Sequence, residues 1–273
     1  MARRARVDAE LVRRGLARSR EHAVELISAG RVLIAGTVAV KPATAVEAGT
    51  PLIVREEPDE VSWASRGAHK LLGALEAFEP QGLSIDGKRC LDAGASTGGF
   101  TDVLLSRGAK EVAAVDVGYG QLIWRLQNDD RVQVYDRTNV RNITPETIGG
   151  PVESVVGDLS FISLNLVLPA LAACAAGGAD LLPMVKPQFE VGKERVGSGG
   201  VVRDPALRAE VVREVAAAAG ALGLQTRGVV ASPLPGPSGN VEYFLWLRKV
   251  GPFDYDAAEV EALVARAVEE GPQ

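Results

Sequence analysis

Between residues 66 and 270, short apolar runs alternate with stretches whose apolar positions recur at helical spacing. The runs of strand length are 89–93, 111–117, 131–136, 153–158, 180–186, 224–231 and 242–249, and the helix patterns lie near 66–78, 99–107, 162–174, 204–221 and 256–269. Alternation at this spacing predicts a mostly parallel sheet with helices on both faces. The last two strands have no helix between them, so we expect one antiparallel strand at the end of this α/β domain.

The first 60 residues follow a different pattern. Residues 6–16 predict a short amphipathic helix, and Ser19 is placed to cap a second helix that ends at Gly30. Two short apolar runs, 32–34 and 38–40, predict a β-hairpin. We therefore expect a small α+β domain here.

A change of composition separates the two patterns. The acidic segment 51–60 contains two prolines and is predicted to be a linker. The domain limits that we expect are 1–60 for the small domain, 61–65 for the interdomain segment and 66–273 for the α/β domain. Trp63 either packs in a core or wedges between the domains, and the pattern allows both.

Charge is distributed unevenly along the chain. Residues 1–55 carry ten Lys and Arg against five Asp and Glu, whereas the remaining residues carry 20 against 30. A basic first domain on an acidic second one indicates that the first domain meets a polyanion. No apolar run approaches the roughly 20 residues of a membrane span, and the basic amino end lacks the apolar core of a secretory signal. We expect a cytoplasmic protein with no membrane partner.

Few residues in the chain are suited to metal or thiol chemistry. Cys90 lies in an apolar run and Cys174 in an alanine-rich helix pattern, which predicts buried, inert thiols in a reducing compartment. The chain has only two histidines, so we expect no metal site and interpret His69 as structural or exposed.

The segment 91–101 (LDAGASTGGFT) leads from a predicted strand through a glycine-rich turn into a helix. A phosphate loop would end in Gly-Lys-Ser/Thr, but Phe100 follows Gly99. A dinucleotide site would have a second glycine at Ser96. A cofactor with adenosine but no phosphates fits better, because Asp116 lies about 20 residues on, where it can accept hydrogen bonds from both ribose hydroxyls.

This combination resembles the S-adenosylmethionine (SAM) site of Rossmann-like methyltransferases; the alternative is a glycine turn in another kind of α/β enzyme. The resemblance implies SAM as the cofactor. It implies cofactor contacts from Asp92, Gly94, Ala95, Ser96, Thr97, Gly98, Gly99, Phe100, Asp116 and Asp158.

Charged residues stand at the ends of three further predicted strands. Asp158 ends one strand, Lys186 ends another, and Glu242 begins the last one. Ligands bind at the carboxyl edge of such sheets, so these residues are candidates for a site, although each alone could be a solvated strand end. Lys70, just before an apolar helix face, would by itself be an ordinary surface lysine.

The basic first domain resembles the S-four (small ribosomal subunit protein four) RNA-binding domain. The matching segments are 6–8, 15–20, 30–32 and 41–42, and the chain departs from the family at Ala35-Gly36, where Asn-Gly is usual. The resemblance implies RNA contacts from Arg4, Arg6, Arg14, Arg18, Arg20, Arg31 and Lys41. The helix patterns leave five arginines pointing outward, Arg13, Arg14, Arg18, Arg20 and Arg31. The alternative is a solvated basic surface.

The segments GDLSFISL (157–164), VKPQFE (185–190) and GNVEY (239–243) are together similar to the TlyA (hemolysin A) family, over about residues 5 to 250. The chain departs from the family in the linker, where the Arg-x-Trp-Val-like segment reads Val-Ser-Trp-Ala at 61–64 and lacks the arginine. That family joins the basic domain to an FtsJ-like RNA ribose 2′-O-methyltransferase. It implies cytidine in small- or large-subunit rRNA, within ribosomal subunits, as substrate; no homo-oligomer is evident.

The resemblance groups Lys70, Asp158, Lys186 and Glu242 as catalytic residues. A 2′-hydroxyl is a poor acid, and a neutral amine can take its proton, so Lys186 is our candidate base and Lys70 the second cation. Asp158 and Glu242 would orient the two amines. The rival hypotheses are a non-catalytic ribosome-assembly factor and a membrane-lytic protein, and the latter lacks the amphipathic or apolar stretch it needs.

Overall fold

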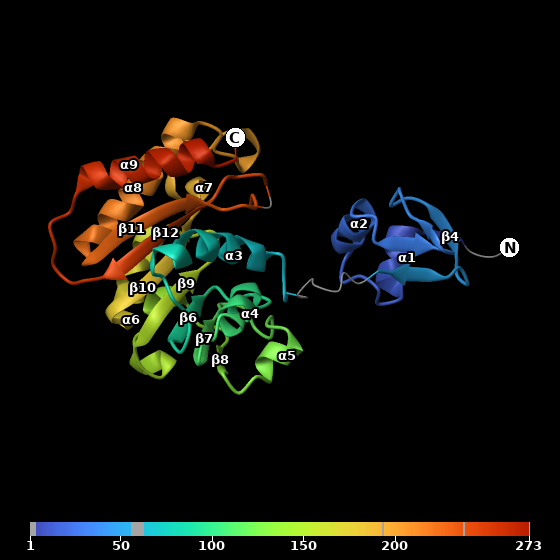
Figure 1. The fold of residues 1–273 in the computed structure, drawn as a ribbon, viewed down its shortest axis with the longest axis horizontal. Helices are drawn as coiled ribbons and strands as arrows, with labels where there is room; N and C mark the ends of the chain where they lie inside the picture. Colours follow the sequence, from blue (N-terminus) through green and yellow to red (C-terminus); the bar gives the residue numbers. More distant parts are fainter. Residues whose placement is uncertain (1–3, 56–62, 193, 237, 273) are drawn as a thin grey trace. The chain divides into compact units, whose positions relative to one another are not determined.

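A computed structural model describes residues 4–55, 63–192, 194–236 and 238–272 (Figure 1). The chain separates into two compact units, Met1–Ser62 and Trp63–Gln273, which we call the N-terminal unit and the C-terminal unit. Each is described by itself below. Among the described residues, no helix combines the length and the apolar character needed to cross a membrane.

The N-terminal unit packs two helices with short strands. Its elements are β1 (Arg4–Arg6), α1 (Val7–Arg13), α2 (Arg20–Ser28), β2 (Val32–Ile34), β3 (Thr37–Val38), β4 (Ala45–Glu47) and β5 (Leu52–Val54). The predicted cap is confirmed: the Ser19 hydroxyl accepts a hydrogen bond from the His22 amide at 3.2 Å. The hairpin is confirmed too, since β2 pairs antiparallel with β3 around a two-residue turn. Its second strand is Thr37–Val38 rather than the predicted 38–40.

The prediction of a linker from residue 51 is wrong for Leu52–Val54. This segment is strand β5, and it pairs antiparallel with the whole of β2. Its three apolar residues complete the small sheet, where Leu52 and Val54 pack against the core of the unit. Residues 56–60 of the predicted linker lie outside the described residues.

The C-terminal unit is built on one seven-stranded sheet. Its strands are β6 (Arg89–Ala93), β7 (Glu111–Val115), β8 (Val132–Tyr135), β9 (Val152–Gly157), β10 (Ala175–Val185), β11 (Leu224–Ala231) and β12 (Tyr243–Lys249). They lie in the order β11-β12-β10-β9-β6-β7-β8. Strand β12 runs opposite to the other six strands of this sheet, so the predicted α/β fold with one antiparallel strand is confirmed.

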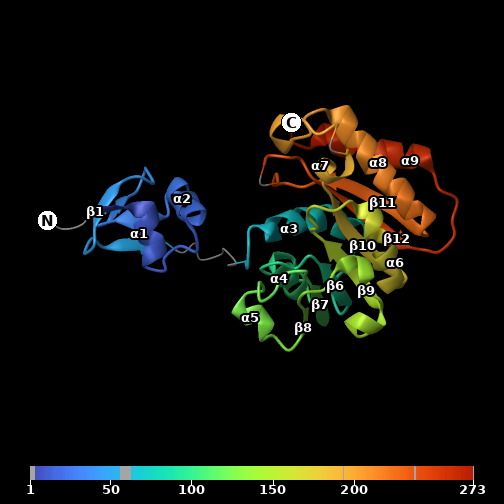
Figure 2. The same ribbon diagram turned by 180° about the vertical axis from the view of Figure 1, so that it is seen from behind.

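Helices cover both faces of this sheet (Figures 1 and 2). They are α3 (Gly67–Phe78), α4 (Gly99–Ser106), α5 (Trp124–Gln127), α6 (Leu168–Cys174), α7 (Pro187–Glu190), α8 (Pro205–Ala221) and α9 (Ala257–Glu270). Strand β12 contributes side chains to a hydrophobic core on each face of the sheet. Tyr243 and Leu245 pack with α6, α8 and α9 on one face. Phe244 and Trp246 pack with α3 and α4 on the other. Alternate side chains of a strand point to opposite faces.

Two boundaries in the C-terminal unit differ most from the prediction. The helix expected over 162–174 is a short 3-10 turn (Leu164–Leu166) followed by α6, which has Pro169 in its first turn. A proline starts a helix more readily than it continues one. Strand β10 begins at Ala175, five residues earlier than predicted, because Ala175 pairs with Val152 before a shift in register.

Trp63 and its neighbours pack on the C-terminal unit. Trp63 lies against the core formed by α3 and α4, and the Ala64 amide donates to the Asp102 carboxylate at 2.8 Å. Trp63 is therefore a core-packing residue. Residues 61 and 62 of the predicted interdomain segment lie outside the described residues.

Candidate active site

Strand register brings the charged strand ends to one edge of the sheet. Asp158 follows β9 and Lys186 follows β10, and these strands run parallel. Glu242 precedes β12, which runs the other way, and the pair Val185–Tyr243 places the start of β12 beside the end of β10. Lys70 reaches the same place from the second turn of α3. The four residues named from the sequence thus form one site.

Within this site the charges form two ion pairs. Lys70 Nζ lies 2.6 Å from Glu242 Oε2, with both side chains buried. Lys186 Nζ lies 2.5 Å from Asp158 Oδ1, where Lys186 is buried and Asp158 is half-buried. A buried amine needs such a partner, because an unpaired buried charge is strongly destabilising. Each carboxylate therefore holds one amine in place.

Two further polar side chains complete the site, and sequence reasoning did not select them. The Lys186 amine donates to the Ser160 hydroxyl at 2.9 Å. The Gln188 amide donates to Glu242 Oε1 at 3.5 Å. Both residues belong to the segments that carry the family resemblance. Ser160 lies two residues after Asp158 and Gln188 two residues after Lys186, and this spacing could have identified them.

The glycine-rich loop 94–99 has a backbone that only small residues permit. Gly94 and Gly98 have φ values of 88° and 100°, a region that glycine occupies without strain. A Cβ on Gly94 would lie 2.8 Å from the Asp158 carbonyl, and one on Gly99 would lie 2.3 Å from the Ser65 hydroxyl. These glycines are thus required by close packing against the chain itself, in addition to any contact with a ligand.

Asp116 lies at the end of β7 with its carboxylate fixed by backbone donors. Its Oδ2 accepts from the Ser96 amide at 2.9 Å and its Oδ1 from the Gly118 amide at 2.7 Å. The carboxylate therefore ties the glycine loop to the next strand end. Each oxygen keeps a second lone pair for a ligand hydroxyl.

Asp92 is fully buried at the end of β6. Its Oδ2 accepts from the Thr101 hydroxyl at 2.7 Å, and its Oδ1 has no hydrogen-bond partner among the described residues. Burial raises the pKa of Asp92 to about 7; Thr101 opposes this and the Asp158 and Asp116 carboxylates add to it. A buried carboxylate with one free oxygen suits a cationic ligand group.

Three other residues predicted to contact the cofactor, Ala95, Thr97 and Phe100, make contacts within the protein itself. The Ala95 amide donates to the Val115 carbonyl at 3.1 Å, and the Thr97 carbonyl accepts from the Ile123 amide at 3.2 Å. The ring of Phe100 is buried 6.0 Å from that of Phe244. Its side chain therefore belongs to the hydrophobic core.

Phe161 is an exposed aromatic residue beside the lysine site. Its side chain is 90% exposed, its φ is 62°, and its ring centroid lies 5.2 Å from that of Phe189. It is separated from Asp158 by two residues. An exposed ring held beside reactive side chains is suited to stacking on a nucleic-acid base.

In the N-terminal unit, two of the predicted RNA-binding arginines converge on one carboxylate. Asp8 accepts from Arg6 at 2.7 and 3.1 Å and from Arg20 at 3.3 Å. These hydrogen bonds, Arg6 first, lower the pKa of Asp8 to about 2. Both guanidinium groups stay largely exposed, so the pair presents two oriented cations.

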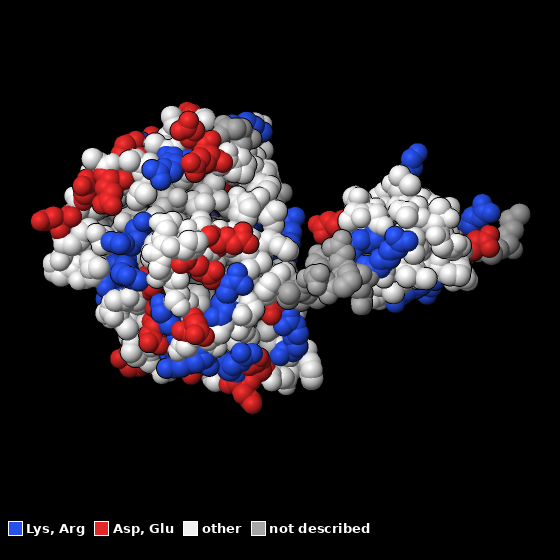
Figure 3. All heavy atoms as spheres, in the orientation of Figure 1, with Lys and Arg blue, Asp and Glu red and all other residues white. Residues whose placement is uncertain are grey.

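The remaining residues predicted to bind RNA differ in their exposure and in their polar partners. Arg18 and Lys41 are exposed, Arg4 lies 3.5 Å from Glu47 on the surface, and Arg31 donates to the Arg55 carbonyl at 3.1 Å. On the face shown in Figure 3, blue covers more of the N-terminal unit than red does, whereas both colours mix over the C-terminal unit.

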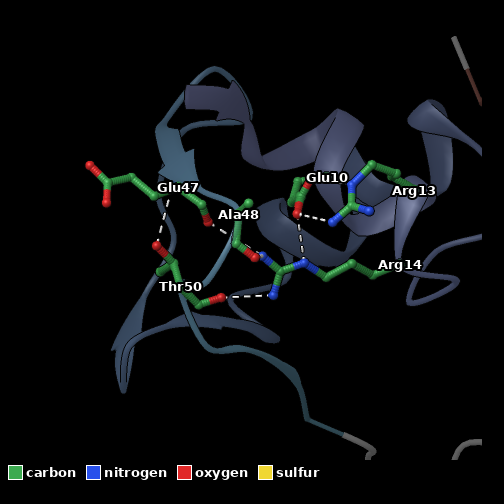
Figure 4. Close-up of polar contacts among 6 residues, drawn as sticks. All are labelled: Glu10, Arg13, Arg14, Glu47, Ala48 and Thr50. Atoms are coloured by element: carbon green, nitrogen blue, oxygen red, sulfur yellow. Dashed lines mark hydrogen bonds and ion pairs between the residues drawn. The ribbon is translucent and has the colours of Figure 1, made fainter. Parts of the chain in front are cut away.

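The expectation that Arg14 points outward is wrong. Its guanidinium donates to Glu10 and to the carbonyls of Thr50 and Ala48 at 2.7–2.8 Å (Figure 4). Glu10 also binds Arg13. Arg14 therefore ties the end of α1 to the turn after β4. Arg31 is likewise only partly exposed.

No group of three or more His, Cys, Asp or Glu side chains that could hold a metal ion is found in the part of the chain that the structure describes. Both cysteines are buried, and burial raises the pKa of Cys90 to about 12 and that of Cys174 to about 11. Inert thiols are thus consistent with their surroundings.

A mostly parallel sheet with a glycine loop after its first strand, an acidic residue after the next, and two lysines ion-paired with carboxylates at the same edge defines a Rossmann-like methyltransferase. Comparison with known proteins agrees: residues 63–249 match the FtsJ-like methyltransferase family and residues 5–52 match the S4 domain. The chain is 64% identical over 272 residues to the 16S/23S rRNA (cytidine-2′-O)-methyltransferase TlyA of Mycobacterium tuberculosis, with 100% of both chains covered. It belongs to the TlyA family.

Two further comparisons support this membership. The 23S rRNA (cytidine-2′-O)-methyltransferase TlyA of Campylobacter jejuni is 34% identical over 188 residues, which cover 68% of this chain and 71% of that protein. A solved structure described as a hemolysin from Streptococcus thermophilus has a TM-score of 0.75 and 39% identity, and the match covers 99% of this chain and 98% of that one.

Proposed function

We propose that this methyltransferase transfers a methyl group from SAM to the ribose 2′-hydroxyl of cytidine in ribosomal RNA. The observation that carries the proposal is the double ion pair Lys70–Glu242 and Lys186–Asp158 at the edge of the sheet, next to the glycine loop. The site contains two amines and two carboxylates but no reactive thiol. These groups suit the transfer of a methyl group to an oxygen atom. The relatives' names support cytidine in one or both ribosomal subunits.

The residues around the glycine loop fit SAM. Asp116 would bind the ribose hydroxyls of the cofactor, because backbone amides already orient its carboxylate. Asp92 would neutralise the ammonium group, because its Oδ1 is buried and lacks a partner among the described residues. When bound, SAM supplies an electrophilic methyl group, and the protein's part is then to position and deprotonate the acceptor.

Lys186 would accept the proton of the 2′-hydroxyl. Its amine lies between Asp158 and Ser160, which fix its direction. The ammonium of this ion pair has to lose a proton before the amine can act as a base. Lys70, held by Glu242, is the second cation of the site and stabilises negative charge that develops on the ribose oxygen. Phe161 would stack on the base of the target nucleotide or its neighbour.

The N-terminal unit would dock the enzyme on ribosomal RNA. Arg6 and Arg20, oriented by Asp8, and the exposed Arg18 and Lys41 would contact phosphates. Phosphate contacts provide affinity and register rather than base identity. We propose that the substrate is rRNA within ribosomal subunits, in the cytoplasm.

The test is single-turnover methylation of ribosomal subunits from cells that lack this gene, followed by mapping of 2′-O-methyl groups. Wild type should modify cytidine ribose, and Lys186→Ala should abolish transfer while SAM still binds. Lys186→Arg should be equally inactive, because a guanidinium stays protonated and cannot act as a base. If the arginine variant kept most of the wild-type rate, Lys186 would be a positioning residue. SAM binding without any transfer by wild type would favour an assembly factor.

A further inference from the structure

The loops that follow β9 and β10 are held together at three points. Next to the sheet, Lys186 binds Asp158 and Ser160. Further out, the rings of Phe161 and Phe189 contact each other at 5.2 Å. At the far end, Glu190 binds the residues that close the first loop. We call 158–163 the first loop and 186–190, which includes the short helix α7, the second loop.

Glu190 makes the outermost of these contacts with both of its oxygens. The Ser163 hydroxyl donates to Oε2 at 2.6 Å, and the Leu164 amide donates to Oε1 at 2.8 Å. Burial raises the pKa of Glu190, and these two hydrogen bonds oppose the effect. Hydrogen bonds to an ionised carboxylate are about twice as strong as those between neutral groups. Glu190 thus closes the gap between the loops without touching the two lysines.

The first loop needs such outside support. Within the described residues, no backbone–backbone hydrogen bond involves residues 159–162. Phe161 has a φ of 62°, and a bulky residue in this region is strained by about 1–2 kcal/mol. A strained residue persists only when its surroundings determine its conformation. For Phe161 the contact that the structure shows is the one with the ring of Phe189 on the second loop.

We propose that Glu190 is a positioning residue that locks the first loop onto the second, and so holds Phe161, Asp158 and the Lys186 amine in the arrangement that receives the target ribose. This role rests on the proposed ribose methylation and extends it. Glu190 acts through these residues and contacts no reacting atom. Its loss should therefore lower turnover far more than SAM affinity, because Asp92 and Asp116 belong to β6 and to the end of β7, away from these contacts.

The experiment compares Glu190→Ala and Glu190→Gln with Glu210→Ala. Glu210 is a suitable control because it is a nearby glutamate on α8 whose partner is the exposed Arg195, 2.5 Å away. Glutamine can still accept from Leu164 and can donate to Ser163, so it should keep kcat within about threefold of wild type. Glu190→Ala should lower kcat by about ten- to a hundredfold, since a misplacement of 1 Å can reduce the rate a hundredfold.

A double-mutant cycle with Phe161→Ala shows whether the effect is transmitted through the first loop. Residues that act through one element are not additive, so the double variant should be little slower than the slower single one. SAM affinity by calorimetry should stay within about twofold for all variants. If Glu190→Ala fails to fold, Ser163→Ala tests the same contact from the other side and should lower kcat by about threefold or more.

Three results would overturn this role: a kcat of Glu190→Ala equal to that of Glu210→Ala, full additivity with Phe161→Ala, or a failure of glutamine to restore turnover. Each of these results can be obtained only if the wild-type protein methylates ribose. Absence of ribose methylation by wild type would instead overturn the proposed function, so the two failures are distinguishable.

Discussion

Substitution of Asp92 by asparagine should move stability and cofactor affinity in opposite directions. The two side chains are nearly the same size, and the amide carbonyl of the asparagine could still accept from Thr101, which now donates at 2.7 Å. The substitution removes the ionisable carboxyl group. Because Asp92 is fully buried with one oxygen unpartnered among the described residues, its ionised form destabilises the cofactor-free fold.

The size of this effect follows from linkage. The pKa of Asp92 is about 7 in the folded chain, against an ordinary value of 3.8, and each pKa unit corresponds to about 1.4 kcal/mol. As pH rises from 4 to 7, the unfolded chain ionises this carboxyl before the folded chain does, so stability is lost over this window. Relative to wild type, Asp92→Asn should gain up to about 4 kcal/mol by pH 8 and little at pH 4.

Urea unfolding followed by tryptophan fluorescence is the suitable assay. All three tryptophans, Trp63, Trp124 and Trp246, belong to the C-terminal unit, so the signal reports on this unit. The free energy of unfolding is measured without SAM at pH 4.5, 6 and 8 for both proteins, and SAM affinity by calorimetry at pH 8. A constant offset between the variants at every pH would refute the reasoning, as would unchanged SAM affinity, which should fall at least about tenfold.

Three further predictions concern the two units separately. Asp116→Ala should weaken SAM binding about tenfold or more without unfolding the protein, since it removes a charged acceptor; unchanged affinity by calorimetry would exclude Asp116 as the ribose ligand. Replacing Arg6, Arg18 and Arg20 by alanine should reduce the slope of log K against log salt for RNA binding by about two, with turnover at saturating RNA retained, and an unaltered slope would place the RNA surface elsewhere. Ala35→Asn should stabilise the N-terminal unit by about 0.5–1 kcal/mol, because Ala35 has a φ of 49° in the hairpin turn and asparagine tolerates that region better; slower amide exchange in β2 is the measurement, and no change would show that the turn is unstrained.

The amino-acid sequence alone was sufficient for the main elements of the C-terminal unit. Strands buried on both faces require continuous apolar runs, so six of the seven strands lie within about two residues of their predicted limits, and β10 differs at its start. Charged residues at the ends of such runs mark the ligand-binding edge of the sheet. Asp116, Asp158, Lys186 and Glu242 could therefore be selected before any contact was known, and the family resemblance added Lys70.

Which residues bind each other was decided by the tertiary structure. Lys70 and Glu242 are 172 positions apart, and no local pattern shows that Lys70 binds Glu242 while Lys186 binds Asp158. The pairing of β5 with β2 and the inward contacts of Arg14 are equally non-local. Glu190 ends one of the segments that carry the family resemblance, but the sequence does not show what it binds, since its contacts depend on two loops meeting after separate strands. Side-chain type limits what a residue can bind, but register and loop conformation determine its partner.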